Sequence, residues 1–172
     1  MIVLEVHRND IFSIQGVGFM KVGIIVYSQT GNTLSVAQRL EEAMKASGHT
    51  VNIVRVEPEN NKVSGPMIKL KSVPDVSPYD VIIFASPVQG FSLAPVMKMY
   101  LSKVSGLNGK IVYCYVTQQL KKTWMGGNRA IKQITAACKA KGADIQSSGV
   151  VNWSSSIREE QISDIVNRFL IV

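Results

Sequence analysis

The sequence predicts a three-layer α/β fold, in which helices cover both faces of a doubly wound, five-stranded parallel sheet. From residue 20 onward, short β-branched runs alternate with helical patterns. The run at residues 21–27 is almost continuously apolar, as expected for a strand that is covered on both faces. The residues that follow, 32–47, repeat their apolar side chains along one stripe, which is typical of an amphipathic helix. Alternating strands and helices of this kind form parallel sheets through right-handed crossovers.

The remaining elements follow in the same order along the chain. Further strands are expected at residues 50–56, 79–85, 110–117 and 143–151, and further helices at 95–104, 128–141 and 158–170. Residues 57–77 contain several prolines and glycines and are predicted to be irregular, with a short helix at 67–72. At 172 residues the chain is expected to form one domain, which spans residues 20–172.

Residues 1–19 stand outside this scheme as an N-terminal extension. Two apolar runs, at residues 2–6 and 11–14, flank a polar stretch, which predicts a hairpin. Three interpretations are open: an added edge pair, a dimerisation arm that would make the protein a homodimer, or an over-long gene start ahead of Met20.

Composition narrows the range of partners. The net charge is +7, but the basic residues are spread along the chain with no nucleic-acid motif, so we expect no nucleic-acid partner. No apolar run reaches the roughly 18 residues of a membrane span, so we expect no membrane partner. Cys114 and Cys138 form no CxxC pair and are expected to be buried thiols, which favours a cytoplasmic location. The two histidines are isolated and predict no metal site.

A polar loop between the first strand and the first helix is the strongest functional signal. It consists of Ser28, Gln29, Thr30, Gly31, Asn32 and Thr33. Its hydroxyl and amide groups are donors, its glycine permits a positive φ, and the helix that follows directs free N–H groups to the same place. Ordinary helix capping would also favour serine and threonine here. Capping a helix needs fewer polar residues than this loop has, which are three hydroxyl residues and an asparagine, with a glycine, in six positions. The loop therefore favours a phosphate site.

Two more loops follow predicted strands at the same edge of the sheet. The candidates in the second loop are Pro87, Val88, Gln89, Gly90 and Phe91, with Pro87 and Gly90 expected to bend the chain. The candidates in the third loop are Thr117, Gln118, Gln119, Trp124, Gly126 and Gly127. Ligands of doubly wound sheets bind at the carboxyl ends of the strands, so these loops are expected to contribute to the same site.

The pattern Ser-x-Thr-Gly-Asn-Thr after a buried strand resembles the flavodoxin family over residues 20–172. The resemblance implies the strand order 2-1-3-4-5 and an FMN cofactor, with its phosphate in the first loop and its ring between the second and third. It also implies that Gln89 and Gly90 meet the ring through their backbone, and that residues 117–119 meet its pyrimidine end. For Phe91 and Trp124 two roles stay open, contact with the ring or ordinary packing.

Other nucleotide-binding and catalytic classes lack their motifs. A P-loop would need the motif GxxxxGK[ST], and a dinucleotide-binding fold would need GxGxxG after its first strand. A response regulator would need an aspartate at the position of Ser86 and Pro87. A serine or cysteine hydrolase would need a nucleophile elbow and a suitably placed histidine, and neither is present.

Two functional classes therefore remain for an FMN protein. One is an NAD(P)H-dependent FMN or quinone reductase, and the other is an electron carrier between redox partners. Carrier flavodoxins are typically acidic, also in the third loop, whereas this chain is basic and its third loop has no acidic residue. The oxidoreductase is therefore the main prediction, with NAD(P)H as a candidate donor and a partner protein or small molecule as acceptor. No catalytic side chain is expected, because the flavin carries the redox chemistry.

Overall fold

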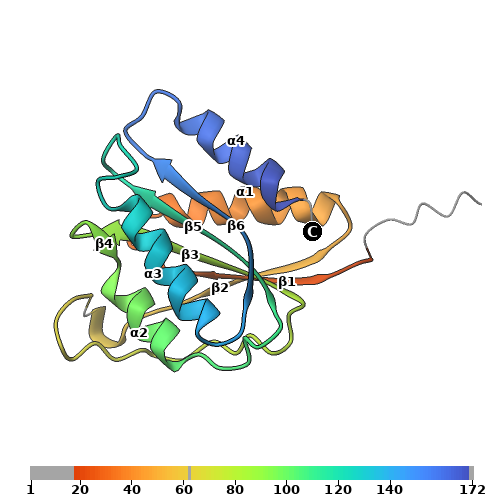
Figure 1. The fold of residues 1–172 in the computed structure, drawn as a ribbon, viewed down its shortest axis with the longest axis horizontal. Helices are drawn as coiled ribbons and strands as arrows, with labels where there is room; N and C mark the ends of the chain where they lie inside the picture. Colours follow the sequence, from red (N-terminus) through yellow and green to blue (C-terminus); the bar gives the residue numbers. More distant parts are fainter. Residues whose placement is uncertain (1–17, 62, 171–172) are drawn as a thin grey trace, which may run out of the picture.

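A sheet with the strand order β2-β1-β3-β5-β6 lies at the centre of the structure, a computed structural model that describes residues 18–61 and 63–170 (Figure 1). Its parallel strands are β1 (Lys21–Val26), β2 (Thr50–Arg55), β3 (Val81–Gln89), β5 (Ile111–Gln118) and β6 (Asp144–Asn152). The helices are α1 (Asn32–Ala46), α2 (Pro95–Lys103), α3 (Gly127–Lys139) and α4 (Arg158–Phe169). The two-residue strand β4 (Ser92–Leu93) pairs with β3 and lies outside this order, so the fourth and fifth parallel strands carry the labels β5 and β6. The predicted order 2-1-3-4-5 is therefore confirmed.

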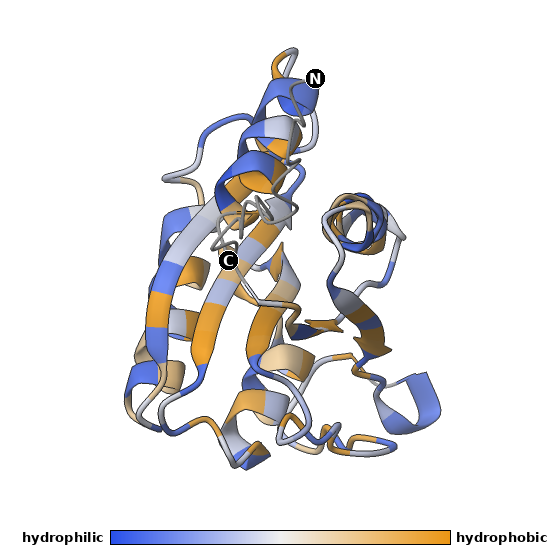
Figure 2. Cartoon of the chain, turned by 90° about the vertical axis from the view of Figure 1, so that its right-hand side faces the viewer, coloured by the Kyte–Doolittle hydropathy of each residue, from blue (hydrophilic) through white to orange (hydrophobic). Residues whose placement is uncertain are grey.

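Two apolar layers separate the sheet from its helices. Helices α1 and α4 cover one face, and α2 and α3 cover the other (Figure 1). Alternate residues of β1 serve the two layers: Val22 and Ile24 pack toward α1, whereas Ile25 packs toward the opposite face. Figure 2 shows the same division, with apolar residues along the strands and polar residues on outer helix faces and loops. The almost continuous apolar run in the sequence reflects burial on both sides.

The segment between β2 and β3 differs from the prediction. The helix expected at residues 67–72 is wrong, since the described residues of this segment contain only a 3-10 turn, Glu59–Asn61, and an isolated bridge between Pro58 and Leu70. Asn60 has a positive φ of 53°, which interrupts regular helical geometry. The prolines and glycine of this segment further disfavour a helix.

Strand β3 is longer than predicted, and the chain reverses direction directly after it. It continues to Gln89, because Pro87 pairs with Thr117 of β5 and does not end the strand. Beyond that point β4 pairs with it antiparallel, and the chain reverses at Gly90 and Phe91. The expected bend at Pro87 was therefore wrong, and the one at Gly90 is observed. A proline can lie near the end of a strand, where fewer ladder hydrogen bonds need its N–H.

Three further expectations concern the chain as a whole. Cys114 and Cys138 are buried as predicted, and burial raises the pKa of each thiol to about 12. Among the described residues, no helix has both the length and the apolar character to cross a bilayer. The hairpin expected in the N-terminal extension falls on residues 1–17, which lie outside the described residues.

Candidate functional site

Three loops from the carboxyl ends of β1, β3 and β5 meet around one cavity of about 220 Å³. The sequence predicted each loop separately, and the parallel sheet brings them together because its strands all end at the same edge. The lining residues are Gln29, Thr30, Asn32, Pro87, Val88, Gln89, Thr117, Gln118 and Gln119. All nine are among the predicted candidates.

The first loop offers unused donors at the start of α1. Among the described residues, none accepts a hydrogen bond from the backbone N–H groups of residues 29–33. Gly31 has a φ of 95°, and an added Cβ there would meet open space. Ser28 is buried and its Oγ accepts from the N–H of Leu34 at 3.3 Å, so its hydroxyl caps the helix. The donors open to a ligand therefore come from the backbone, from the exposed Thr30 and from the half-buried Asn32.

A buried hydrogen-bonded chain ties the first loop to the third. The hydroxyls of Thr33 and Thr117 are 2.7 Å apart, and the Tyr115 hydroxyl donates to the Thr33 carbonyl at 2.7 Å. Burial raises the pKa of Tyr115 well above its ordinary value, so the phenol stays protonated and can donate. Thr33 is only 1% exposed and does not line the cavity. Its position indicates that it sets the spacing of the loops.

The second loop is a tight turn that holds an aromatic side chain out in solvent. Gly90 and Phe91 both have a φ of 56°, the left-handed geometry of a two-residue hairpin turn. Phe91 is 60% exposed, so the packing role left open by the sequence does not hold. Gln89 Nε2 donates to Gln29 Oε1 at 3.0 Å, which links the second loop to the first.

The third loop is organised around one buried amide. Gln118 Nε2 donates to the carbonyl of Leu120 and to Asn152 Oδ1, at 3.3 and 2.6 Å. Nε2 also donates to the Lys122 carbonyl, so the side-chain donors of Gln118 face its own loop and the end of β6. Its Oε1 is buried without a partner among the described residues. Trp124 is 71% exposed, which argues against an ordinary packing role.

Two glycines let the third loop approach its neighbours. A Cβ on Gly126 would lie 2.8 Å from the Cα of Phe91, so the second and third loops touch backbone to backbone. A Cβ on Gly127 would lie 2.6 Å from a methyl group of Val150 on β6. Both glycines therefore shape the site through the space that they leave free.

One basic side chain next to the first loop was not among the predicted site residues. Arg55, the last residue of β2, donates from Nη2 to the carbonyl of Ser28 at 3.2 Å. A second cavity of about 280 Å³ lies on this side of the first loop and includes Tyr27, whose buried hydroxyl has no partner among the described residues. The pairing of Arg55 with Val26 could have revealed its position, but only once the register of β1 and β2 was known.

The turn at Phe91 leads to a prediction about stability. Replacing Phe91 with glycine should raise the free energy of unfolding by about 1 kcal/mol, because glycine adopts a positive φ without strain. Phe91→Ala removes the same ring but keeps the strain, and so serves as the matched control. Chemical denaturation of both variants measures the difference, and equal stabilities would show that the turn is not strained.

The residues of the cavity fit an FMN molecule. Free N–H groups at the start of a helix, with a glycine that leaves open space, are the donor set that a phosphate dianion requires. The lining parts of the second and third loops supply polar backbone and amide groups for a flat ring system. The exposed rings of Phe91 and Trp124 belong to the same two loops but are not among the residues that line the cavity.

The sequence matches the family model described as NADPH-dependent FMN reductase over residues 20–151. Among curated proteins, no significant match to the sequence was found. The family match covers the first, second and third loops and ends within β6. It confirms FMN as the predicted cofactor.

Solved structures with the same fold include several flavodoxins. The two-electron reduced flavodoxin of Megasphaera elsdenii has a TM-score of 0.65 at 22% identity, over 88% of this chain and 99% of that one. The Streptococcus pneumoniae flavodoxin has a TM-score of 0.61 at 17% identity, over 88% and 98%. A Lactobacillus acidophilus flavoprotein, solved in complex with FMN, has a TM-score of 0.57 at 18% identity, over 83% and 98%. The predicted flavodoxin-like fold is thereby confirmed.

Proposed function

Because the chain belongs to the NADPH-dependent FMN reductase family, we propose that it is an enzyme that holds FMN in the three-loop cavity and oxidises NADPH. The observation that carries this proposal is the convergence of the three loops on one cavity, with unpartnered amides at residues 29–33. The chain has a net charge of +7, which attracts an anionic nucleotide substrate, whereas electron-carrier flavodoxins are typically acidic. Its charge therefore favours the enzyme over the electron carrier.

In this proposal the side chains bind and orient, and none needs to act as an acid or base. The first loop receives the phosphate, and the exposed hydroxyl of Thr30 adds a donor at its rim. The Thr33–Thr117 pair and the Gln29–Gln89 contact set the distances between the loops, so the ring site is formed in advance. FMN held by these loops would supply the redox chemistry, which is hydride and electron transfer between NADPH and an acceptor.

The proposal also covers the electron acceptor, the cellular location and the oligomeric state. A quinone, a free flavin or a redox protein would each accept electrons from a flavin held near the surface. The buried, unpaired thiols Cys114 and Cys138 favour a cytoplasmic enzyme. A homodimer remains a prediction that depends on residues 1–19.

A reconstitution assay tests the proposal directly. Purified protein should carry or take up one flavin with FMN specificity, measured by absorbance and by quenching of flavin fluorescence. The loaded protein should then oxidise NADPH with a quinone as acceptor, whereas the same protein before loading should not. Failure to take up FMN would contradict the cofactor site. Uptake without NADPH oxidation would contradict the enzyme and favour an electron carrier.

A further inference from the structure

A basic groove lies next to the three-loop cavity and is not used by the proposed FMN site. It has a volume of about 700 Å³ and is formed by the third loop and by the turn between β6 and α4. Its cationic lining residues are Lys121, Lys122 and Arg158, and its other lining residues are Trp153 and the three serines at 154–156. None of the described residues that line it carries a carboxylate.

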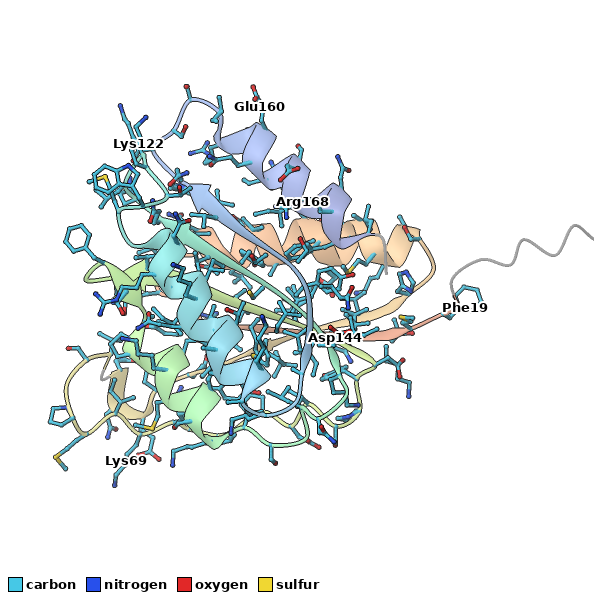
Figure 3. All side chains as sticks on the ribbon, viewed as in Figure 1. Phe19, Lys69, Lys122, Asp144, Glu160 and Arg168 are labelled. Carbon is cyan, nitrogen blue, oxygen red and sulfur yellow. The ribbon has the colours of Figure 1, made fainter. Side chains whose placement is uncertain are left out.

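The positive charge of the groove is largely uncompensated. Within the part of the chain that the structure describes, neither Lys121 nor Lys122 forms an ion pair. Both side chains are exposed, and Lys122 projects from the end of the molecule in Figure 3. Both ammonium groups are therefore free to attract an anion that enters the groove.

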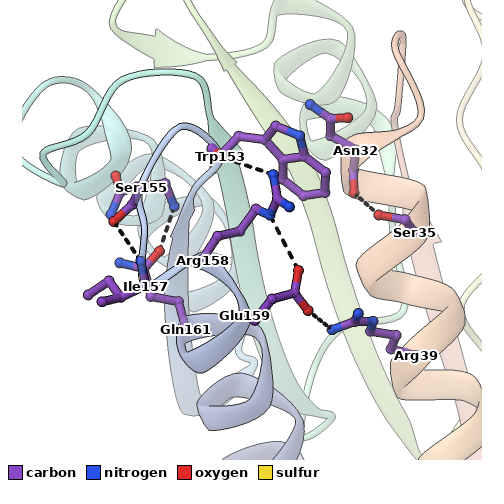
Figure 4. A network of polar contacts seen from close by, with 10 residues as sticks. Asn32, Ser35, Arg39, Trp153, Ser155, Ile157, Arg158, Glu159 and Gln161 are labelled. Carbon is purple, nitrogen blue, oxygen red and sulfur yellow. Dashed lines mark hydrogen bonds and ion pairs between the residues drawn. The ribbon is translucent and has the colours of Figure 1, made fainter.

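The opposite wall of the groove is held in place by a network at the start of α4. The Arg158 guanidinium stacks 4.9 Å from the centre of the Trp153 ring, and it also contacts Glu159 at 3.3 Å (Figure 4). Glu159 in turn pairs with Arg39 of α1 at 2.7 Å. This carboxylate is shared by two cations, so the network keeps an excess of positive charge. Trp153 and Arg158 are thus fixed before any ligand binds.

The groove and the three-loop cavity share a wall. Gln119 lines the cavity, and its Nε2 donates to the hydroxyl of Ser154, which lines the groove, at 2.7 Å. The N–H of Trp153 donates to the Gln118 carbonyl at 2.7 Å, joining the same two segments. A ligand that spans this wall would have one end at the ring site and the other among the cations.

We infer that the groove binds the phosphate groups of the nicotinamide dinucleotide, above all the 2′-phosphate that distinguishes NADPH from NADH. This inference rests on the proposed function, since it assigns a subsite to the proposed donor. NADPH carries its nicotinamide ring and its 2′-phosphate at opposite ends, which suits a ring site and a cationic groove on two sides of one wall. Lysines and serine hydroxyls are suitable donors for a phosphate dianion.

Binding of 2′,5′-ADP tests the subsite without any flavin chemistry. The double variant Lys121→Gln/Lys122→Gln should bind 2′,5′-ADP about tenfold more weakly than the unmodified protein, measured by calorimetry at low salt. The matched control, Lys69→Gln/Lys103→Gln, removes the same charge from exposed lysines of a different surface, beside the β2–β3 segment and α2. It should leave the affinity unchanged. In the FMN-loaded protein, the groove variant should lose most of its preference for NADPH over NADH.

Each other outcome is decisive. If the unmodified protein does not bind 2′,5′-ADP, or if the groove variant binds it equally well, the inference is wrong. Equal losses in the groove variant and the control would also overturn it, because general charge would then explain binding. If the groove serves an acidic protein instead, 2′,5′-ADP binding will not depend on the two lysines. Groove-dependent binding of 2′,5′-ADP by a protein that does not oxidise NADPH would uphold the subsite and contradict the proposed enzyme.

Discussion

Replacing Thr30 with glutamate should weaken FMN binding at least a hundredfold. Thr30 is exposed at the rim of the first loop and lines the cavity, so the change places a carboxylate beside the proposed phosphate site. Two like charges about 4 Å apart near a protein surface repel by about 4 kcal/mol, or about a thousandfold in a dissociation constant. The repulsion therefore outweighs any new contact. Titration of the apoprotein with FMN, followed by flavin fluorescence, measures the effect.

The matched control is Thr30→Gln, which has the shape of glutamate without its charge. It should weaken FMN binding far less, because an amide can still donate to a phosphate oxygen. Thermal unfolding of both variants should match that of the unmodified protein, since the Thr30 side chain is exposed and makes no hydrogen bond to another described residue. If the glutamate variant bound FMN as well as the glutamine variant, the first loop would not be the phosphate site.

Replacing Gly126 with alanine should destabilise the protein and weaken FMN binding together. Gly126 has a φ of 119°, which a residue with a Cβ adopts only with strain. Its added Cβ would also lie 2.8 Å from both the Phe91 Cα and a methyl group of Val88, so the second and third loops must separate. We expect a loss of about 2–3 kcal/mol in the free energy of unfolding. The affinity for FMN should fall about tenfold or more.

A second glycine separates the two causes of this loss. Gly106 also has a positive φ, of 80°, but a Cβ there would meet open space. Gly106→Ala should therefore show the backbone strain alone, about 1 kcal/mol, and leave FMN binding unchanged. Urea denaturation and FMN titration of the two variants measure both quantities. Equal losses at the two positions would mean that the contact between the loops contributes nothing.

The proposed site illustrates how a binding site can be built from residues with different tasks. Backbone N–H groups, the Thr30 hydroxyl and exposed rings are free to contact a ligand. The hydroxyls of Thr33 and Thr117 and the amide of Gln118 are buried and bind other protein groups. A polar residue in a motif can therefore serve the ligand indirectly, by setting the position of the loop that does contact it.

Much of the fold could be predicted from the sequence because it depends on local patterns. Apolar runs at residues 21–27 and 110–117 predicted strands, and the observed strands agree to within about one residue at each end. The short helix at 67–72 was wrong, and Gly65 and Pro74, which flank these residues, disfavour a helix that extends beyond them. The β3–β4 hairpin was missed because Phe91 is an unusual residue for a position with positive φ.

The three loops could be predicted from local patterns, since each is a polar, glycine-containing segment after a buried strand, and parallel strands end at one edge of the sheet. Which of their side chains are free depends on contacts between distant parts of the chain. Thr33 meets Thr117 across 84 positions of sequence, and Arg55 reaches Ser28 across 27. The groove of Lys121, Lys122 and Arg158 likewise joins a loop and a helix that are far apart in the chain. The burial and pairing of these side chains depend on contacts between residues far apart in the sequence, and no local pattern specifies those contacts.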